Sequence, residues 1–192
     1  MESHEVLVGK KKNVKYVNEQ FFKKWSASMA YVMGYFAADG CLTENVARRN
    51  KYIEFVSIDK EMIEKVKELL DAKHKVGIKK HKNPIWKTAY RIQIGSKEIF
   101  QDLSKLGFTT KKSLTINFPN VPGKYLAHFA RGYFDGDGNI SYGYYNVKDR
   151  KNKKFYIMVR FTSGNIDFLE KLSKNLQHFA NIIGGSIFHN SN

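Results

Sequence analysis

The alternation of hydrophobic and polar residues predicts a helix and a hairpin at the start of the folded region. Ser26 precedes an almost wholly apolar stretch that ends at Ala38, which predicts an N-capped helix buried on nearly every side. Two segments near 41–47 and 51–58 then alternate between apolar and polar positions, as strands do when one face is covered. The chain is therefore expected to form a hairpin directly after a buried helix.

A second group of elements follows in the first half of the chain. Asp59 is a suitable N-cap for a helix whose apolar side chains recur at helical spacing. Strands are expected near 74–81 and 87–94, and a further helix over about 97–106 stops before a glycine. The predicted order is thus helix, two strands, helix, two strands, helix.

The second half of the chain repeats the beginning of this order. Residues 161–163 match residues 55–57, and an amphipathic helix follows in both places. The second hairpin is longer than the first, and residues 183–187 are expected to begin a third strand. The fourth strand and the last helix have no counterpart in the sequence, so the two repeats are unequal.

These patterns predict an α+β fold with pseudo-two-fold symmetry and four segments along the chain. The segments are an N-terminal arm (1–20), a first repeat (21–110), a linker (111–123) and a second repeat (124–192) that stops after its third strand begins.

The two apolar helices carry the same short motif, Tyr31–Gly40 and Ala130–Gly138. Each has a glycine in the middle, which costs a helix roughly 1 kcal/mol relative to alanine. Gly34 and Gly132 are therefore expected to let two helix backbones approach closely, most simply those of these two helices.

Each motif ends in Asp-Gly, which places Asp39 and Asp137 at helix C-termini. The negative end of the helix dipole disfavours a carboxylate there, and two such helices side by side would add repulsion between the carboxylates. A divalent cation would offset it, and Mg²⁺ prefers a few carboxylates together with water and phosphate oxygens. A single Asp-Gly would be interpreted as a helix end before a hairpin, whereas two copies in a basic protein favour a metal site that hydrolyses phosphodiesters.

The amino-acid composition indicates what kind of partner the protein binds and in what compartment it is expected. The 192 residues include 33 basic and 18 acidic side chains, a formal net charge of +15, which favours a polyanion over a merely solvated basic surface. Cys41 is the only cysteine, so disulfides and cysteine-based zinc sites are excluded and a reducing compartment is favoured. No apolar run is long enough to cross a membrane and no signal peptide precedes the motifs, so an intracellular location, cytoplasmic or organellar, is expected.

The paired motifs resemble those of the LAGLIDADG homing endonuclease family. The stretches that carry the resemblance are Trp25–Gly40 and His128–Gly138, and the family's αββαββα repeat order covers about 21–110 and again 124 to the end. The resemblance implies a monomer whose two halves contribute strands to a saddle-shaped antiparallel sheet in the major groove of double-stranded DNA. It also implies Mg²⁺-dependent, site-specific cleavage of a long target, with Mn²⁺ as a substitute and Ca²⁺ binding without cleavage.

The resemblance also implies roles for individual residues. Asp39 and Asp137 would be the metal ligands, assisted by the main-chain carbonyls of Ala38 and Gly136. Asp135 has no acidic counterpart in the first motif and is interpreted as structural.

A basic residue beside the metals is expected near the end of the fourth strand. Lys97 stands there as a candidate catalytic residue, with an ordinary exposed lysine as an equal alternative and Lys111 and Lys112 as further candidates. Asp59 and Asn165 fall where relatives often have a water-organising glutamine, but both are interpreted as N-caps.

Polar strand positions are expected to face DNA if the apolar positions face the helices. Arginine and glutamine can recognise base edges, whereas the lysines are expected mainly at phosphates. The candidates are Arg48, Arg49, Lys51, Glu54, Lys75, Lys79, Arg91, Gln93, Lys148, Arg150, Lys151, Lys153, Lys154 and Arg160.

Two other classes of function remain open. A non-cleaving protein on the same scaffold, an intron maturase or a regulator, is kept open by the short second repeat. That short repeat is compatible with a truncated chain, a degenerate copy or a nickase. A general RNA-binding domain would not need paired Asp-Gly helix ends.

Overall fold

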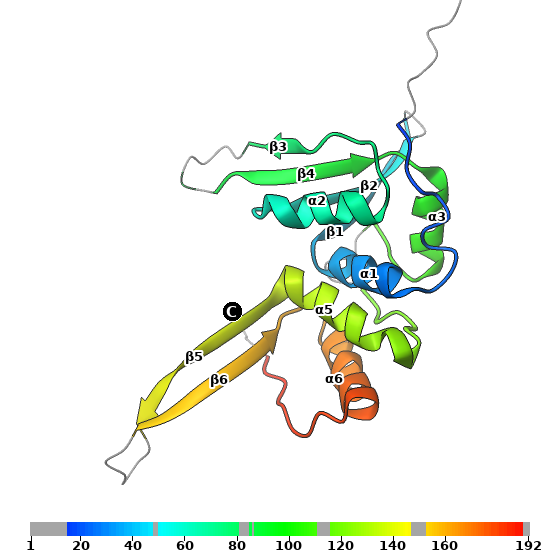
Figure 1. Ribbon diagram of the computed structural model, residues 1–192. Coiled ribbons are helices and arrows are strands. Elements are labelled where there is room, and N and C mark those ends of the chain that lie inside the picture. The colour runs from blue at the N-terminus through cyan, green and yellow to red at the C-terminus, as the bar shows by residue number, and fades with distance from the viewer. Residues whose placement is uncertain are drawn as a thin grey trace, which may run out of the picture.

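The computed structural model of the chain describes residues 15–47, 50–80, 85, 87–110, 116–146 and 153–189. Two motif helices, α1 (Ala27–Asp39) and α5 (Leu126–Asp137), pack side by side at the centre of the molecule (Figure 1). Each is followed by a hairpin and a further helix, so the two halves share one order of elements. The predicted α+β fold class is confirmed.

Helix α1 forms because its sequence supplies both a cap and an apolar surface all round. The Ser26 hydroxyl accepts the amide of Met29 at 3.0 Å, which satisfies one of the free donors of the first turn. Every residue from Met29 to Ala37 is buried, since α5 and the first sheet enclose the helix. The buried central helix predicted from the sequence is confirmed.

The first half contains a four-stranded antiparallel sheet in the order β1-β2-β4-β3. The strands are β1 (Gly40–Asn45), β2 (Asn50–Ser57), β3 (Gly77–Lys79) and β4 (Ala89–Ile94). Gly40, directly after α1, lies opposite Phe55, and Phe55 lies opposite Ile92. This register ties the C-terminus of α1 to the middle of the sheet.

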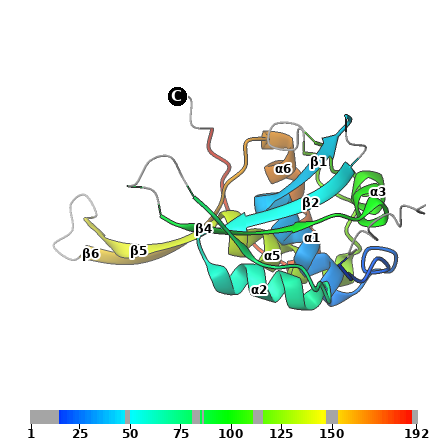
Figure 2. The ribbon, with the colours of Figure 1, turned by 90° about the horizontal axis from the view of Figure 1, so that it is seen from above.

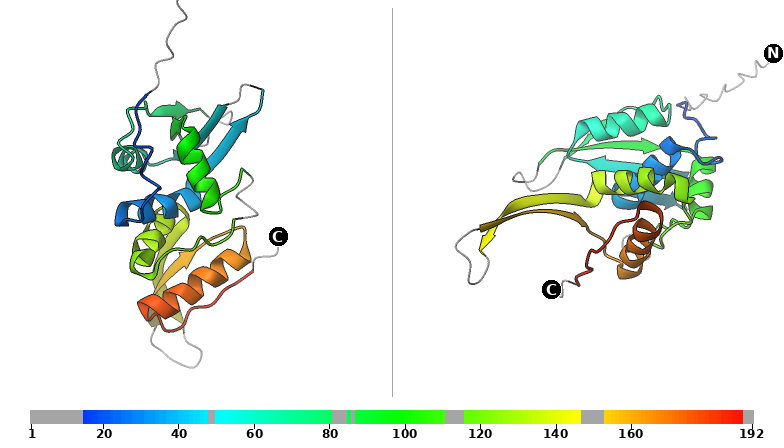
Figure 3. Two further views of the ribbon diagram at one scale, coloured as in Figure 1. Left: turned by 90° about the vertical axis from the view of Figure 1, so that its right-hand side faces the viewer. Right: turned by 60° about the horizontal axis from the view of Figure 1, so that its bottom comes forward.

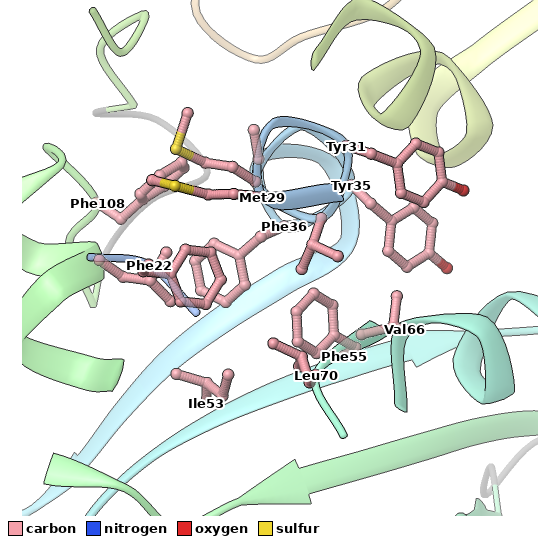
Figure 4. Close-up of a cluster of buried hydrophobic side chains, with 14 of the residues drawn as sticks. Phe22, Met29, Tyr31, Tyr35, Phe36, Ile53, Phe55, Val66, Leu70 and Phe108 are labelled. Carbon is pink, nitrogen blue, oxygen red and sulfur yellow. The ribbon is translucent and has the colours of Figure 1, made fainter. Parts of the chain in front are cut away.

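Two helices complete the first half on the apolar side of this sheet. They are α2 (Lys60–Leu69), capped by Asp59, and α3 (Lys97–Lys105), capped by Ser96. Figure 4 shows Phe22, Phe36, Ile53 and Phe55 converging beneath α1. All of these side chains are buried, and they form one continuous core with the helix.

The expected strand over 74–81 is only three residues long among the described residues, and the segment before it is held differently. The amide of Lys73 donates to the carbonyl of Tyr16 at 2.8 Å, and that of Asn18 donates to the carbonyl of Leu70 at 3.0 Å. Residues 16–18 of the expected N-terminal arm therefore pack on the folded unit, with Val17 buried.

The second half consists of α5, a two-stranded ribbon and α6. A short 3₁₀ turn (Gly123–Tyr125) leads into α5, and the ribbon pairs β5 (Gly138–Asn146) with β6 (Lys153–Phe161). The ribbon extends away from the rest of the molecule, as Figure 2 shows from above. Helix α6 (Ile166–Ala180) packs beside α5 (Figure 3).

The prediction of a third strand at 183–187 is wrong. Residues 181–189 contain no strand, and Gly184 and Gly185 have φ angles of 91° and 99°. Backbone in this region of φ is available to glycine but does not continue an extended strand. Among the described residues, the second half therefore contains no counterpart of β3, β4 or α3.

One face of the ribbon is apolar and exposed. We call it the ribbon face; it comprises Ile140, Tyr142, Tyr144, Phe155, Ile157 and Val159. Phe161 lies opposite Gly138 as Phe55 lies opposite Gly40, so Val159 occupies the position of Ile53. Val159 is 57% exposed, whereas Ile53 is 0% exposed in the first half.

No helix in the described parts of the chain is both long enough and apolar enough to cross a membrane.

Candidate metal centre and nucleic-acid surface

The contact between α1 and α5 is closest at the two motif glycines. A Cβ on Gly34 would overlap the carbonyl oxygen of Phe129 and lie 2.9 Å from its carbon. A Cβ on Gly132 would meet the carbonyl group of Tyr31 in the same way, again 2.9 Å from the carbon. The reciprocal contacts place a pseudo-two-fold axis between the helices and bring their C-termini together.

The two helix ends place Asp39 beside the backbone of the other half. A Cβ on Gly136 would overlap that of Ala38 and would lie 3.4 Å from the Asp39 Oδ2. Asp39 is half-buried and Asp137 is exposed. Each helix ends at the glycine that follows its aspartate, where the amides of Gly40 and Gly138 still donate to carbonyls of the last turn.

A hollow of about 160 Å³ lies next to Asp137. Both halves contribute to it, and its lining residues are Ala37, Ala38, Ile116, Tyr133, Asp137, Ser163 and Gly164. A space of this size admits several water molecules. The carboxylate of Asp137 therefore adjoins a site with room for solvent.

A buried tyrosine lies one helical turn before each aspartate. Burial raises the pKa of Tyr133 to about 12, the Ser163 hydroxyl opposes this shift and the Asp137 charge adds to it. The Tyr133 hydroxyl donates to the carbonyl of Thr162 at 2.6 Å. It thereby ties α5 to the end of the ribbon.

The equivalent tyrosine of α1 is held differently. Burial raises the pKa of Tyr35, the Ser57 hydroxyl opposes the shift, and the neighbouring carboxylates of Asp39 and Asp59 raise it further. The Tyr35 hydroxyl oxygen is buried close to Ser57 and Asp39, but within the described structure none of its contacts has the geometry of a hydrogen bond. Its ring lies parallel to that of Phe55, with the ring centres 6.1 Å apart.

A polar cluster around Tyr31, one helical turn before Tyr35 on the same side of α1, links three helices. The Tyr31 hydroxyl donates to the Asp135 Oδ2 at 2.7 Å and accepts from the Lys65 Nζ at 2.9 Å. Lys65 and Asp135 also approach to 3.9 Å. This network joins α2 of the first half to α5 of the second and supports the structural interpretation of Asp135.

The donor set at the paired helix ends fits a hard divalent cation. Two carboxylates and adjacent main-chain oxygens match the few protein ligands that Mg²⁺ takes, with water and phosphate completing its shell. Among the described residues, no group of three or more histidine, cysteine or acidic side chains could hold a metal ion, so a tetrahedral zinc site is not supported there. The residues that would hold such an ion are the predicted ones, Asp39 and Asp137 with the main-chain carbonyls of Ala38 and Gly136.

Lys97 is the first residue of α3 and is exposed. In the sheet, Ile92 of β4 lies level with Gly40, because both are opposite Phe55. From Ile92 the strand runs away from Gly40 and then reaches Lys97. The further candidates, Lys111 and Lys112, lie outside the described residues.

Asp59 and Asn165 are both N-caps, as the sequence predicts. Asp59 accepts the Glu61 amide at 2.9 Å, and Asn165 accepts the Asp167 amide at 2.9 Å. The side-chain amide of Asn165 also donates to the Ile116 carbonyl at 3.0 Å.

The outer face of the four-stranded sheet gathers most of the described polar candidates from the first half. Glu54 lies opposite Gln93, and Arg91 lies between Val56 and Gly77. The strand alternation also puts Lys79 on this face, away from the helices, and Lys75, which precedes β3, lines a hollow together with Arg91 and Gln93. In the ribbon, Arg160 occupies the position of Glu54 and lies opposite Asn139.

Lys51 lies on the other face of the sheet. Its Nζ is 3.2 Å from Glu44 and 4.9 Å from the ring centre of Phe100 in α3, because residues 51, 53 and 55 share the helix-covered side.

The remaining candidates belong to the hairpin ends. Lys153 and Lys154 lie at the far end of the ribbon, opposite Asn146 and Tyr145. The other five fall outside the described residues, namely Arg48, Arg49, Lys148, Arg150 and Lys151.

Sequence reasoning did not identify Tyr35, Tyr133 or Lys65. The repeated spacing Tyr-x-x-x-Asp in the two motifs was the available signal for the tyrosines, since residues four apart share a helix face. Nothing in the sequence pairs Lys65 with Asp135, which are distant along the chain.

Comparisons with known proteins agree with this geometry. A profile of the LAGLIDADG-like domain matches residues 26–106. The fold is similar to that of the homing endonuclease I-WcaI bound to its DNA recognition sequence, with 16% identity, 92% of this chain and 77% of that chain covered, and a TM-score of 0.53. It is also similar to I-SmaMI bound to an uncleaved DNA target in the presence of calcium ions, with 14% identity, 80% and 73% coverage, and a TM-score of 0.50. A search of curated protein sequences gives no significant match.

The matched residues 26–106 contain the first of the two motifs, and the fold is similar to that of homing endonucleases, so both comparisons support the resemblance to the LAGLIDADG family.

Proposed function

We propose that this protein is a site-specific, divalent-metal-dependent DNA endonuclease of the homing type. One observation carries the proposal: the carboxylate of Asp39 lies against Gly136 of the other half, at the joined C-termini of α1 and α5. Two helix ends and two aspartates concentrate negative charge at one point, which favours a divalent cation there. The net charge of +15 and the DNA-bound structures of similar fold support a duplex DNA substrate.

In the proposed reaction, the chain positions the target and the ligands. Gly34 and Gly132 set the helix separation, and hence the distance between Asp39 and Asp137. The hollow beside Asp137 has room for water and would give it access to a phosphodiester bound at the helix ends. A divalent ion held by the two aspartates, with the Ala38 and Gly136 carbonyls, would supply an activated water and stabilise charge on the phosphate.

We further propose that the outer sheet face and the ribbon bind the DNA. Glu54 and Gln93 are cross-strand neighbours, which supports a role for Glu54 as an acceptor from base edges and for Gln93 as a donor to them. Lys75, Lys79, Lys153, Lys154 and Arg160 would add phosphate contacts. Mg²⁺ is the proposed ion, with Mn²⁺ as a substitute and Ca²⁺ binding without cleavage.

The unequal halves favour a second candidate, a non-cleaving maturase or regulator on the same scaffold. Among the described residues, the second half has no helix equivalent to α3 and no counterpart of Lys97. Because β4 leads away from the Gly40 end of the sheet before it reaches Lys97, the exposed-lysine alternative is favoured, and Lys97→Met is expected to change neither the cleavage rate nor DNA retention.

Selection from a randomised duplex library, in Mg²⁺ and separately in Ca²⁺, tests the proposal. Asp39→Asn and Asp137→Asn are each expected to lower the cleavage rate by roughly 100-fold or more, because each removes a charged ligand. Asp135→Asn is the matched control, since it removes one charge from the same helix while contacting Tyr31 and Lys65 instead. Cleavage that persists in both ligand variants contradicts the site, and specific retention without cleavage in either metal supports the second candidate.

A further inference from the structure

A second hollow, of about 200 Å³, lies at the outer edge of the four-stranded sheet. It is lined by Lys15, His74, Lys75, Gly77, Arg91 and Gln93. β3 is the edge strand, so the hollow is remote from the α1–α5 helix ends along the sheet order. Three of the six lining residues are cationic and none is acidic. We call this site the edge hollow.

The three cations of the edge hollow are electrostatically uncompensated. Within the described residues, Lys15, Lys75 and Arg91 form no ion pair, whereas the neighbouring Lys73 is paired with Asp71 at 2.7 Å. Gathering three like charges around a depression without a carboxylate is unfavourable unless an anion enters. The edge hollow therefore has the charge of an anion site, and the same charge argues against a metal ion.

His74 is a second, independent sign of a ligand. It is 8% exposed, lines the edge hollow, and its Nδ1 has no hydrogen-bond partner in the described structure. Burial and the charge of Lys15 hold the pKa of His74 below its ordinary value. The His74 imidazole is therefore neutral, and it can hydrogen-bond to an anion in the edge hollow without adding a fourth positive charge.

Gly77 shapes the edge hollow and orients Arg91. Gly77 lies opposite Arg91, and a Cβ placed on it would be 3.8 Å from the Arg91 Cγ and 3.9 Å from the Nε. The arginine side chain thus lies across the glycine, along the sheet surface. Arg91 thus lines the edge hollow together with Lys15 and Lys75, which favours contact with an anion there over recognition of a base edge.

We propose that the edge hollow clamps a single backbone phosphate of duplex DNA between Lys15, Lys75 and Arg91. This inference rests on the proposed DNA-binding function and assigns Arg91 to phosphate instead of to base recognition. Lysine is a point-charge donor suited to phosphate, and phosphate contacts set the register of a protein on the duplex without reading sequence.

Salt dependence of binding tests the clamp. The affinity of the full chain for a labelled random-sequence duplex is measured by fluorescence anisotropy over a range of KCl concentrations. Each neutralised phosphate contributes about 0.9 to the slope of log affinity against log salt. The triple variant Lys15→Ala, Lys75→Ala, Arg91→Ala is expected to lose about 0.9 in total, because the three side chains share one phosphate.

Two further variants separate the edge hollow from general charge. Gly77→Val keeps all three cations but fills the space, and is expected to weaken binding and lower the slope by a similar amount. The added Cβ makes only ordinary contact with Arg91, so this variant is expected to fold. Lys73→Ala removes the same charge from the same segment outside the edge hollow, and is expected to leave the slope unchanged.

A titration with inorganic phosphate tests whether the edge hollow binds a DNA phosphate or a free anion. Chemical shifts of the histidine ring are followed while phosphate is titrated into DNA-free protein. A DNA clamp predicts weak or absent saturation; tight saturation with an unchanged DNA slope in the triple variant would identify a free-anion site and overturn the proposal.

Other outcomes are equally decisive. A slope loss of about three times 0.9 in the triple variant would mean three separate phosphate contacts, and no loss would remove the edge hollow from the interface. If the wild-type protein does not bind duplex DNA, the proposed function itself is contradicted. Wild-type binding with a triple variant that behaves identically sinks only the clamp.

Discussion

At the scale of single residues, Tyr35 and Tyr133 occupy equivalent positions in the two motifs but contribute differently to the stability of the fold. Tyr133 satisfies its buried hydroxyl through the Thr162 carbonyl, whereas the Tyr35 hydroxyl makes no hydrogen bond in the described structure. A buried polar group without a partner costs about 1–3 kcal/mol, while a satisfied one contributes about 1 kcal/mol. The same side chain is thus stabilising in α5 and unfavourable in α1, beside Asp39.

Replacement by phenylalanine should therefore have opposite effects at the two positions. Tyr35→Phe is expected to raise the free energy of unfolding by up to about 1 kcal/mol, because it removes an unsatisfied hydroxyl and keeps the ring. Tyr133→Phe is expected to lower it by about 1 kcal/mol. Urea denaturation followed by circular dichroism measures both changes. Equal losses in the two variants would show that the Tyr35 hydroxyl is satisfied.

At the scale of elements, the α1–α5 contact organises the molecule. Gly34 and Gly132 each lie against a carbonyl of the opposite helix, so the helices approach at backbone distance. The Lys65–Tyr31–Asp135 network adds a polar link from α2 to α5. These contacts, more than the sheets, hold the two halves in one arrangement.

Alanine at either motif glycine should separate the helices. Alanine favours a helix by about 1 kcal/mol over glycine, but an added Cβ here would overlap a carbonyl of the facing helix. Gly34→Ala and Gly132→Ala are each expected to lower the free energy of unfolding by about 1–3 kcal/mol, as overpacking does. Gly95→Ala is the control, since a Cβ there meets nothing within 4 Å. A stabilised Gly132→Ala variant would contradict the close approach.

At the scale of the whole molecule, the two halves begin with the same order of helices and strands, but their hairpins differ in how much apolar surface is buried. The first sheet has its apolar face covered by helices, whereas the ribbon face of the second half is exposed. Ile53 and Val159 occupy equivalent positions in the two hairpins, yet only Ile53 belongs to the core. The stability of the fold therefore resides mainly in the first half and in the α1–α5 contact.

Truncation of these two equivalent residues measures the asymmetry. Ile53→Ala is expected to cost about 2–5 kcal/mol, because it leaves a cavity in a closed core. Val159→Ala is expected to change the free energy of unfolding by no more than about 0.5 kcal/mol, because its side chain is largely in solvent. Thermal and urea denaturation of the two variants provide the comparison. A large loss for Val159→Ala would mean that the ribbon face is covered in solution.

The sequence by itself determined the local elements and the candidate ligands of the site. Ser26, Asp59 and Asn165 cap helices as predicted, because a cap depends on residues only a few positions apart. The repeated Asp-Gly motif likewise singled out Asp39 and Asp137 without structural knowledge. Glycine spacing was enough to predict a close helix pair, since its cost in a helix requires a compensating contact.

Only the tertiary structure decided where matching positions of the two halves differ in secondary structure, burial and contacts. The absence of a strand at 183–187, the burial of Ile53 against the exposure of Val159, and the placement of Lys51 over Phe100 depend on what covers each segment. Lys65 approaches Asp135, and Lys15 and Arg91 line the same hollow, although the members of each pair are far apart in sequence. Hydrophobic periodicity and capping are local, whereas burial and charge compensation are set by the neighbours that folding brings together.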